Sequence, residues 1–253
     1  KLAAKVRELD PTRLVTNALP SFFNGLDDED QKRFFLDLMK KSKSTGGNVL
    51  NLDSDFGRSI WGDYTEAFAA PLDVVGYNYL NYQYEESLKK YPNRVICSTE
   101  SKPREMFEYW NDVERFSHVI GDFAWTSYDY IGEAGLGKQE YYHNSEEATA
   151  ASKKLHIAEY PWRLFGGSDI DLCGFPRPQL AYRRILWGSE ETYIAAHNPE
   201  NYGKIEVLGR YGWPDCENSW SWPGYEGRPV KVEVYSASEE VELILNGKSL
   251  GRK

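Results

Sequence analysis

Residues 74–100, VVGYNYLNYQYEESLKKYPNRVICSTE, decide the fold class of this chain of 253 residues. The stretch opens with the apolar run Val74–Leu80 and closes with the run Arg94–Glu100, and a polar segment separates the two. Runs of β-branched residues such as VVGY and RVIC are typical of strands buried on both faces, as in parallel sheets covered by helices. The pattern therefore predicts an α/β protein.

The same alternation continues on both sides of this stretch. Two further apolar runs, Arg13–Leu19 and Val119–Trp125, predict a strand before and a strand after the first two. Amphipathic or mixed patterns predict helices over Asp28–Ser42, Pro103–Phe116 and Arg177–Leu186. A short strand, a loop and a helix thus repeat through the first 190 residues.

Two later segments depart from this rhythm. Gly135–Gly167 is polar and predicts a long loop of the kind that shapes active sites in barrel enzymes. From Thr192 onward, short alternating runs such as VKVEVYS are separated by Gly, Pro and Asn, and Asn246–Gly247 is a two-residue hairpin signal. These runs predict the beginning of a β-sandwich, so we expect one domain over 1–190 and another over 191–253.

Composition excludes several classes of function. The net charge of −9 and the dispersed Lys and Arg residues argue against a nucleic-acid partner. No apolar run reaches the roughly 20 residues that a membrane span requires. The opening residues, KLAAKVRELDPTR, lack the apolar centre of a signal peptide, so we expect any export signal to lie upstream. Aromatic residues make up 15% of the chain, which fits either a β-rich core or stacking on sugar rings.

Cysteine and histidine residues predict no metal or nucleophile motif. Cys97, Cys173 and Cys216 are too few and too scattered for a disulfide framework, and we expect three buried thiols. The four histidines show no metal-ligand spacing and form no His–Cys nucleophile pattern. The sequence therefore predicts neither a metal nor another cofactor.

Glu100 is the first candidate catalytic residue. It ends the run RVICSTE, which places its carboxylate at the C-terminal end of a buried parallel strand. In barrel enzymes this end of the strands carries the catalytic groups. The alternative is a surface carboxylate that caps the following helix, and spacing alone leaves both open.

Side chains at two neighbouring strand ends are candidates for the same pocket. Tyr79 follows the strand before Glu100, where its hydroxyl can hydrogen-bond a carboxylate nucleophile and orient it, and Asn78 is a weaker candidate for a sugar hydroxyl. Trp125 ends the next strand, where an indole can stack on a sugar, and Asp129 and Glu133 lie just beyond it. The alternative for the aromatic residues is ordinary packing of the sheet.

A series of segments, taken in order, resembles the second half of the family 2 glycoside hydrolases. The opening VRELDPTRLVT resembles the helix and strand that follow the acid/base motif of that family. The segments LDVVGYNYL, RVICSTES and GDFAWTSYDYIGE resemble strands six, seven and eight of the TIM barrel of that family. The segment DIDLCGFPRPQLAYRRILW resembles the part that leads into its last barrel helix. The final VKVEVYSASEEVELILNGKSLGRK resembles an immunoglobulin-like domain that follows the barrel. The resemblance covers essentially the whole chain.

The resemblance implies a β-galactosidase-like enzyme. It implies strands five to eight of a (β/α)8 barrel, followed by an incomplete immunoglobulin-like β-sandwich. It assigns Glu100 as the nucleophile, Tyr79 as the residue that orients it and Trp125 as the sugar platform. Asn78, Asp129 and Glu133 follow as further pocket residues.

The same resemblance implies that one catalytic group lies outside the chain. Retaining hydrolysis needs two carboxylates, and the acid/base glutamate of the family comes one helix before Lys1. We therefore expect the chain alone to be inactive, and to be oligomeric or prone to aggregation because four strands leave two barrel edges open. A β-glucuronidase, a β-mannosidase and a non-catalytic carbohydrate-binding fragment remain as alternatives. Relatives of this kind often act outside the cytoplasm, but no residue here indicates export.

Overall fold

The computed structural model describes residues 1–19, 36, 55–152, 158 and 160–253. The helix expected at Asp28–Ser42 lies outside the described residues except for Leu36. The chain forms two compact units: unit 1 comprises 1–101 and 108–124, and unit 2 comprises 102–107 and 125–253. None of the helices in the described part of the chain has the length and apolar character that crossing a membrane requires.

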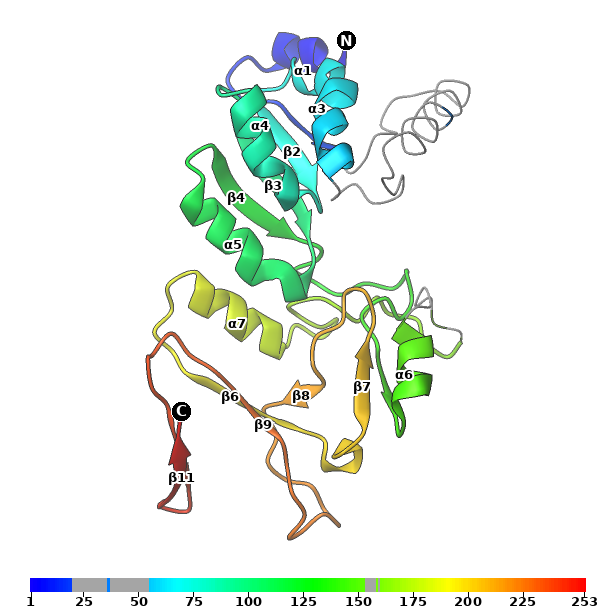
Figure 1. Ribbon diagram of the computed structural model, residues 1–253, viewed down its shortest axis with the longest axis vertical. Helices are drawn as coiled ribbons and strands as arrows, with labels where there is room; N and C mark the ends of the chain where they lie inside the picture. The colour runs from blue at the N-terminus through cyan, green and yellow to red at the C-terminus, as the bar shows by residue number, and fades with distance from the viewer. Residues whose placement is uncertain (20–35, 37–54, 153–157, 159) are drawn as a thin grey trace. The chain divides into compact units, whose positions relative to one another are not determined.

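Unit 1 is built on a four-stranded parallel sheet (Figure 1). Its strands lie in the order β1-β2-β3-β4, and each pairs in parallel with the next. Their bounds are Thr16–Leu19, Val74–Asn78, Ile96–Ser101 and Val119–Ala124. All four expected strands are confirmed, as is a mixed α/β fold with a parallel sheet.

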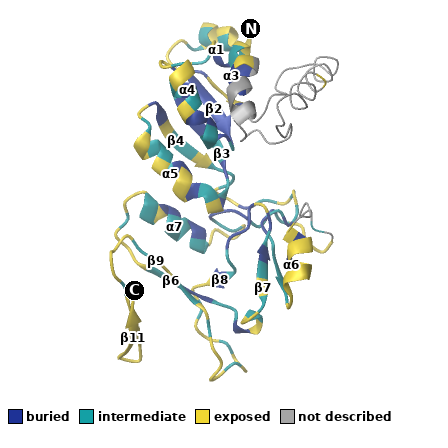
Figure 2. Ribbon diagram, in the orientation of Figure 1, coloured by how far each residue is buried: buried dark blue, intermediate teal, exposed yellow. Residues whose placement is uncertain are grey.

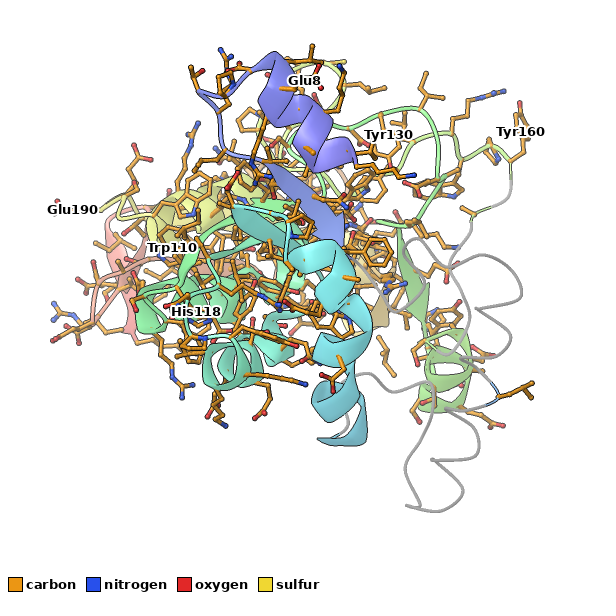
Figure 3. All side chains as sticks on the ribbon, turned by 90° about the horizontal axis from the view of Figure 1, so that it is seen from above. Glu8, Trp110, His118, Tyr130, Tyr160 and Glu190 are labelled. Carbon is orange, nitrogen blue, oxygen red and sulfur yellow. The ribbon has the colours of Figure 1, made fainter. Side chains whose placement is uncertain are left out.

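Helices separate the strands of unit 1 along the chain. The α-helices are α1 (Leu2–Leu9), α3 (Asp55–Ala69), α4 (Tyr84–Lys90) and α5 (Met106–Arg115), with 3-10 turns η1 (Asn81–Gln83) and η2 (Pro103–Glu105). Of these, η2 and the first two residues of α5 belong to unit 2. The helix expected over 103–116 is therefore confirmed as η2 followed by α5. On α5 the indole N–H of Trp110, a residue labelled in Figure 3, donates to Glu114 at 3.1 Å, one turn later.

Aromatic side chains fill the core between the helices and one face of this sheet. Trp61 of α3, Tyr77 of β2 and Tyr84 of α4 are completely buried. The rings of Trp61 and Tyr77 meet edge to face with centroids 4.7 Å apart, and Tyr77 stacks on Tyr84 at 6.0 Å. The Tyr77 hydroxyl is bound by Ser87 at 2.8 Å and by Arg94 at 3.1 Å, so its polar end is satisfied. These contacts fix β2 and β3, whose ends carry the candidate site.

Gly76 of β2 lies where the sheet leaves no room for a side chain. A Cβ at this position would be 2.6 Å from the carbonyl oxygen of Asn17 and 2.7 Å from the methyl group of Thr99. Both distances are below those that real Cβ atoms show, and the first neighbour is backbone. Overpacking of this kind costs about 1–3 kcal/mol.

We expect Gly76→Ala to lower the free energy of unfolding by about 1–3 kcal/mol, because β1 and Thr99 must both shift. A urea titration followed by circular dichroism measures the change. Gly121→Ala in β4 is the matched control, since its Cβ would meet only the sulfur of Cys97 at 3.8 Å, an ordinary contact. Equal stability of the two variants would contradict the tight packing described for Gly76.

Unit 2 contains antiparallel strands and two helices. Strand β5 (Gln139–Tyr142) pairs with β7 (Ile205–Leu208), and a second sheet has the order β8-β6-β9. The strands of the second sheet are β6 (Tyr193–His197), β8 (Cys216–Glu217) and β9 (Val232–Tyr235). A hairpin of β10 (Glu242–Leu245) and β11 (Lys248–Arg252) follows, and Figure 2 shows β11 exposed. The helices are α6 (Ser145–Ser152) and α7 (Pro178–Leu186), with a 3-10 turn η3 at Pro199–Asn201.

Several expectations for this part of the chain are confirmed. Helix α7 agrees with the expected Arg177–Leu186, and its first residue is Pro178, as is common at a helix start. Asn246 and Gly247 join β10 to β11 with φ values of 51° and 78°. Two positive φ values in a two-residue loop are those of the Asn-Gly hairpin turn.

The expected loop at Gly135–Gly167 is wrong in part. The segment contains strand β5 and helix α6, because β5 finds its partner in the distant strand β7 and α6 packs Ala148 and Ala151 against Val207. The backbone of Glu147 donates to the Asn144 side chain at 2.8 Å, which begins this helix.

One of the three expected buried thiols is exposed. Cys97 and Cys216 are buried, and burial raises the pKa of the Cys97 thiol to about 11. Cys173 is exposed because it lies in a surface turn, where its backbone N–H donates to the Asp171 carboxylate at 2.8 Å. The expectation of a buried thiol at Cys173 is therefore wrong.

Candidate functional site

Glu100 lies near the C-terminal end of β3, an inner strand of the sheet in unit 1. Its side chain is half-buried, and its backbone carbonyl accepts from the N–H of Tyr79 at 2.8 Å. The strand register pairs Glu100 with Asn78, and an irregularity in the pairing occurs just before, between Tyr77 and Asn78. The carboxyl edge of the parallel sheet therefore brings together the backbones of Asn78, Tyr79 and Glu100, three of the six residues that the sequence assigns to one pocket.

The residues beside Glu100 are held by polar contacts. Asn78 is buried, and its side-chain oxygen accepts from the hydroxyl of Thr99 at 2.5 Å. Tyr79 has a φ of 57°, a left-handed conformation that costs a non-glycine residue about 1–3 kcal/mol. Such a conformation turns the chain sharply at the strand end, and strained residues of this kind cluster at functional sites.

Ser101 forms a contact that sequence analysis missed. Its side chain is completely buried, and its hydroxyl donates to the carboxylate of Asp122 in β4 at 2.9 Å. This bond ties the end of β3 to the next strand one residue after Glu100. The sequence shows Ser101 directly after Glu100 and Asp122 within the apolar run of the next strand. It does not show that the two side chains meet, because the register between the strands decides that.

In unit 2, Trp125, Tyr130 and Glu133 form a chain of hydrogen bonds. The indole N–H of Trp125 donates to the hydroxyl of Tyr130 at 3.2 Å, and that hydroxyl donates to the Glu133 carboxylate. Burial, and then the bond to Glu133, raises the pKa of Tyr130 to about 12, so the phenol is neutral at physiological pH. Tyr130, labelled in Figure 3, is the link between two expected pocket residues and was not singled out from the sequence.

The ring of Tyr130 belongs to an aromatic row. It meets Trp125 edge to face at 6.2 Å and stacks on Phe165 at 5.2 Å, and Phe165 meets Tyr211 at 5.2 Å. Phe165 is completely buried. This packing fixes the plane of the Trp125 indole, which an aromatic platform for a sugar requires.

Asp129 is buried and holds the segment that follows Trp125 in place. Its side chain has no exposed surface, and its carboxylate pairs with Arg177 at 2.5 Å. The same carboxylate accepts from the backbone N–H groups of Tyr130 and Gly166, each at 3.0 Å. The structure thus gives Asp129 a positioning role for the segment after Trp125, and its expected contact with sugar stays a prediction.

One group of side chains could hold a metal. Among the described residues, His197, Cys216 and Glu233 are the His, Cys and acidic side chains that come close enough together to share an ion. All three belong to unit 2. They come from three strands, so their proximity follows from strand pairing and no short spacing in the sequence reveals it.

Comparison with known proteins identifies the class to which this geometry belongs. The chain is related to the family 2 glycoside hydrolases, and the resemblance found in its sequence is confirmed. Two structures of family 2 members from Bacteroides cellulosilyticus are each 29% identical to it. The first matches with a TM-score of 0.64 and covers 95% of this chain and 35% of the relative's chain. The second matches with a TM-score of 0.56 and covers 89% of this chain and 31% of the relative's chain. A β-glucuronidase 2 of Bacteroides uniformis, covalently bound to cyclophellitol-6-carboxylate aziridine, shares the fold at 12% identity, with a TM-score of 0.55 over 100% of this chain and 25% of its own.

The curated relatives carry two different activity names. A Formosa agariphila protein with a β-glucuronidase name is 23% identical over all of this chain and 22% of its own length. The β-galactosidase BoGH2A of Bacteroides ovatus is 24% identical over all of this chain and 27% of its own. The chain thus spans about a quarter of these relatives. Residues 227–253 also match a family model described as a domain of unknown function, DUF4982.

Proposed function

We propose that this chain is part of a retaining glycoside hydrolase that cleaves terminal β-galactosides. The observation that carries the proposal is the position of Glu100 at the carboxyl edge of the parallel sheet, paired in register with Asn78 and bound through its backbone to Tyr79. Glu100 attacks the anomeric carbon, the glycosidic bond to the leaving oxygen breaks, and a covalent glycosyl ester forms. Water then cleaves the ester and restores the carboxylate.

The second carboxylate of this reaction comes from outside the chain in our proposal. An acid/base group must protonate the leaving oxygen and later deprotonate water, at about 5–5.5 Å from the nucleophile. We assign this role to a glutamate upstream of Lys1, so the chain alone is inactive. Purified separately, it should show no hydrolysis of an aryl β-galactoside. It should also be oligomeric or aggregated, because among the described residues no strand pairs with the outer edge of β1 or of β4.

The exposed side chains of β4 support the proposal of an incomplete barrel. Ile120 is 58% exposed and Phe123 is 66% exposed, and both lie in β4, an edge strand of the described sheet. Two large apolar side chains exposed on one edge strand are consistent with a further barrel strand that covers them. We therefore propose that β1 to β4 are strands five to eight of a (β/α)8 barrel, that 1–190 complete its second half and that 191–253 begin an immunoglobulin-like domain.

Substrate contacts are assigned to residues that follow the strands. The indole of Trp125 serves as the stacking platform, and Glu133 binds a sugar hydroxyl beside it. Asn78 serves as a second polar contact next to the nucleophile, held in place by Thr99. No cofactor takes part in this proposal.

A β-glucuronidase is the second candidate function, because relatives of both names match the chain. The longer protein that contains this chain should be tested with aryl β-galactoside, β-glucuronide and β-mannoside that share one leaving group. We expect kcat/KM for the galactoside to exceed that of either other glycoside by at least about tenfold, or ~1.4 kcal/mol of transition-state stabilisation. Preference for the glucuronide would overturn the galactoside assignment and leave the role of Glu100 intact.

Tyr79→Phe tests the proposed positioning of the nucleophile. Loss of a hydroxyl that orients the Glu100 carboxylate toward the anomeric carbon should lower kcat about 10- to 100-fold, with little change in KM. Tyr82→Phe, three residues later, is the matched control with unchanged kinetics. An unchanged kcat in Tyr79→Phe would count against the role of its hydroxyl.

A further inference from the structure

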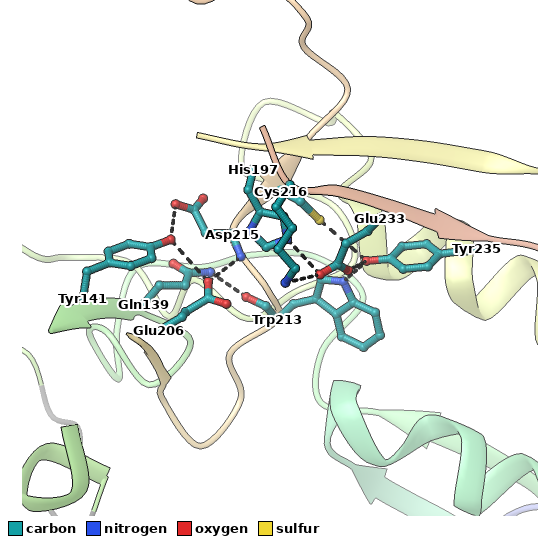
Figure 4. Close-up of polar contacts among 10 residues, drawn as sticks. Gln139, Tyr141, His197, Glu206, Trp213, Asp215, Cys216, Glu233 and Tyr235 are labelled. Atoms are coloured by element: carbon teal, nitrogen blue, oxygen red, sulfur yellow. Dashed lines mark hydrogen bonds and ion pairs between the residues drawn. The ribbon is translucent and has the colours of Figure 1, made fainter. Parts of the chain in front are cut away.

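Three neighbouring strands of unit 2 converge on one group of polar side chains. His197 lies in β6 directly opposite Cys216 in β8, and β6 pairs on its other side with β9, which carries Glu233. Nε2 of His197 is 2.8 Å from Oε1 of Glu233 (Figure 4). The reaction proposed above uses none of these three residues.

We propose that His197, Cys216 and Glu233 bind a zinc ion. The imidazole nitrogen, the sulfur and the carboxylate oxygen all lie within 4.8 Å of one another, so small side-chain rotations bring them to a shared ion. Nitrogen, thiolate and carboxylate are the three protein ligand types of zinc, and a thiolate disfavours the hard ions Mg²⁺ and Ca²⁺. Three protein ligands leave the fourth tetrahedral position for water.

The surroundings of the three ligands suit an ion held between strands. Cys216 is 4% exposed, and the side chains of His197 and Glu233 are 12% and 19% exposed. Of the three ligands, His197 lines a cavity of about 280 Å³, together with Lys231. The sheet therefore holds all three ligands, and the cavity lies beside His197.

Tyr235 fixes the orientation of the carboxylate. Its hydroxyl donates to Oε2 of Glu233 at 2.9 Å and itself accepts from the indole N–H of Trp213 at 2.9 Å. Oε1 is left facing His197. Outer hydrogen bonds of this kind orient metal ligands, and their loss typically costs 10- to 100-fold in metal affinity.

The ammonium group of Lys231 competes with a metal ion for the carboxylate of Glu233. Its ammonium lies 3.0 Å from Oε1 of Glu233, the oxygen that also faces His197, so it must move when an ion binds. The Lys231 side chain is 59% exposed and can turn into solvent. Removing its charge should therefore strengthen zinc binding, which a purely structural hydrogen-bond network would not predict.

The test uses the purified full-length protein, treated with a chelator and titrated with Zn²⁺ or with Co²⁺ as a spectroscopic probe. We expect Co²⁺ to produce a thiolate-to-cobalt charge-transfer band in the near ultraviolet, with one equivalent at saturation, that Zn²⁺ abolishes. Cys216→Ser should eliminate the band, His197→Gln should weaken binding more than about tenfold, and Lys231→Ala should strengthen it. Galactoside hydrolysis is measured in parallel, because the zinc site and the proposed reaction are independent proposals and either can fail without the other.

Matched controls come from exposed residues of the same types. Cys173→Ser and His143→Gln should leave the cobalt spectrum and the affinity unchanged. Circular dichroism checks the folding of each variant, and Lys231→Ala decides the question if the ligand variants do not fold. No thiolate band in the unaltered protein, a band that survives in Cys216→Ser, or an unchanged or weaker affinity in Lys231→Ala would overturn the proposal.

Discussion

Glu100→Gln should lower kcat/KM of the full-length protein by at least about 10⁴-fold, because an amide cannot form the glycosyl ester. Binding should persist, since glutamine keeps the size of the side chain and its place at the end of β3. The measurement is steady-state hydrolysis of an aryl β-galactoside, with circular dichroism to show that the variant folds. Loss of less than about tenfold would contradict a nucleophilic role.

Glu108→Gln is the matched control for this variant. Glu108 lies on α5 with an exposed side chain, and its substitution should leave kcat/KM within about twofold. A second variant, Glu100→Ala, opens space for an added nucleophile. Azide should restore turnover of a substrate with a good leaving group and give the α-glycosyl azide, because a single displacement inverts the anomeric centre.

The largest effect on stability is expected from Asp169→Asn. The carboxylate of Asp169 pairs with Arg183 of α7 at 2.6 Å, and the two side chains are 5% and 4% exposed. Removing the Asp169 charge from beside a buried guanidinium costs about 3–5 kcal/mol. We therefore expect the free energy of unfolding of unit 2 to fall by this amount in a urea titration.

The same pair anchors the segment that follows β4. The backbone N–H of Asp169 donates to the carbonyl of Thr126 at 3.2 Å, next to Trp125, and its carbonyl accepts from Arg177 at 2.8 Å. Glu240→Gln serves as the control, because Glu240 pairs with Arg252 at 3.4 Å with both side chains about 60% exposed and should change stability by less than about 1 kcal/mol. Similar losses in the two variants would contradict the importance of burial.

Local pattern was sufficient to predict the parallel sheet and the edge that carries Glu100. The runs VVGY and VIC are almost entirely apolar because their strands are covered, and that character is visible in any short window. Asn246–Gly247 predicted its hairpin for an equally local reason, since the turn requires two positive φ values.

Features that depend on distant partners could not be predicted. Strand β5 exists because β7 pairs with it, and a polar window such as KQEYYH does not reveal that partner. In β9 the valines were the visible signal, but Val234 is 37% exposed, whereas the carboxylate of Glu233 is bound by His197. The buried bond between Ser101 and Asp122 has the same origin, because a strand register decides it.

The most direct test of the central claim is covalent trapping of the nucleophile in the full-length protein. A 2-deoxy-2-fluoro-galactosyl fluoride forms the glycosyl ester but slows its hydrolysis, so the intermediate accumulates. Digestion and mass spectrometry should then find one added fluorosugar on the peptide that contains Glu100, and Glu100→Gln should remain unlabelled. A fluorosugar on any other carboxylate would contradict the assignment.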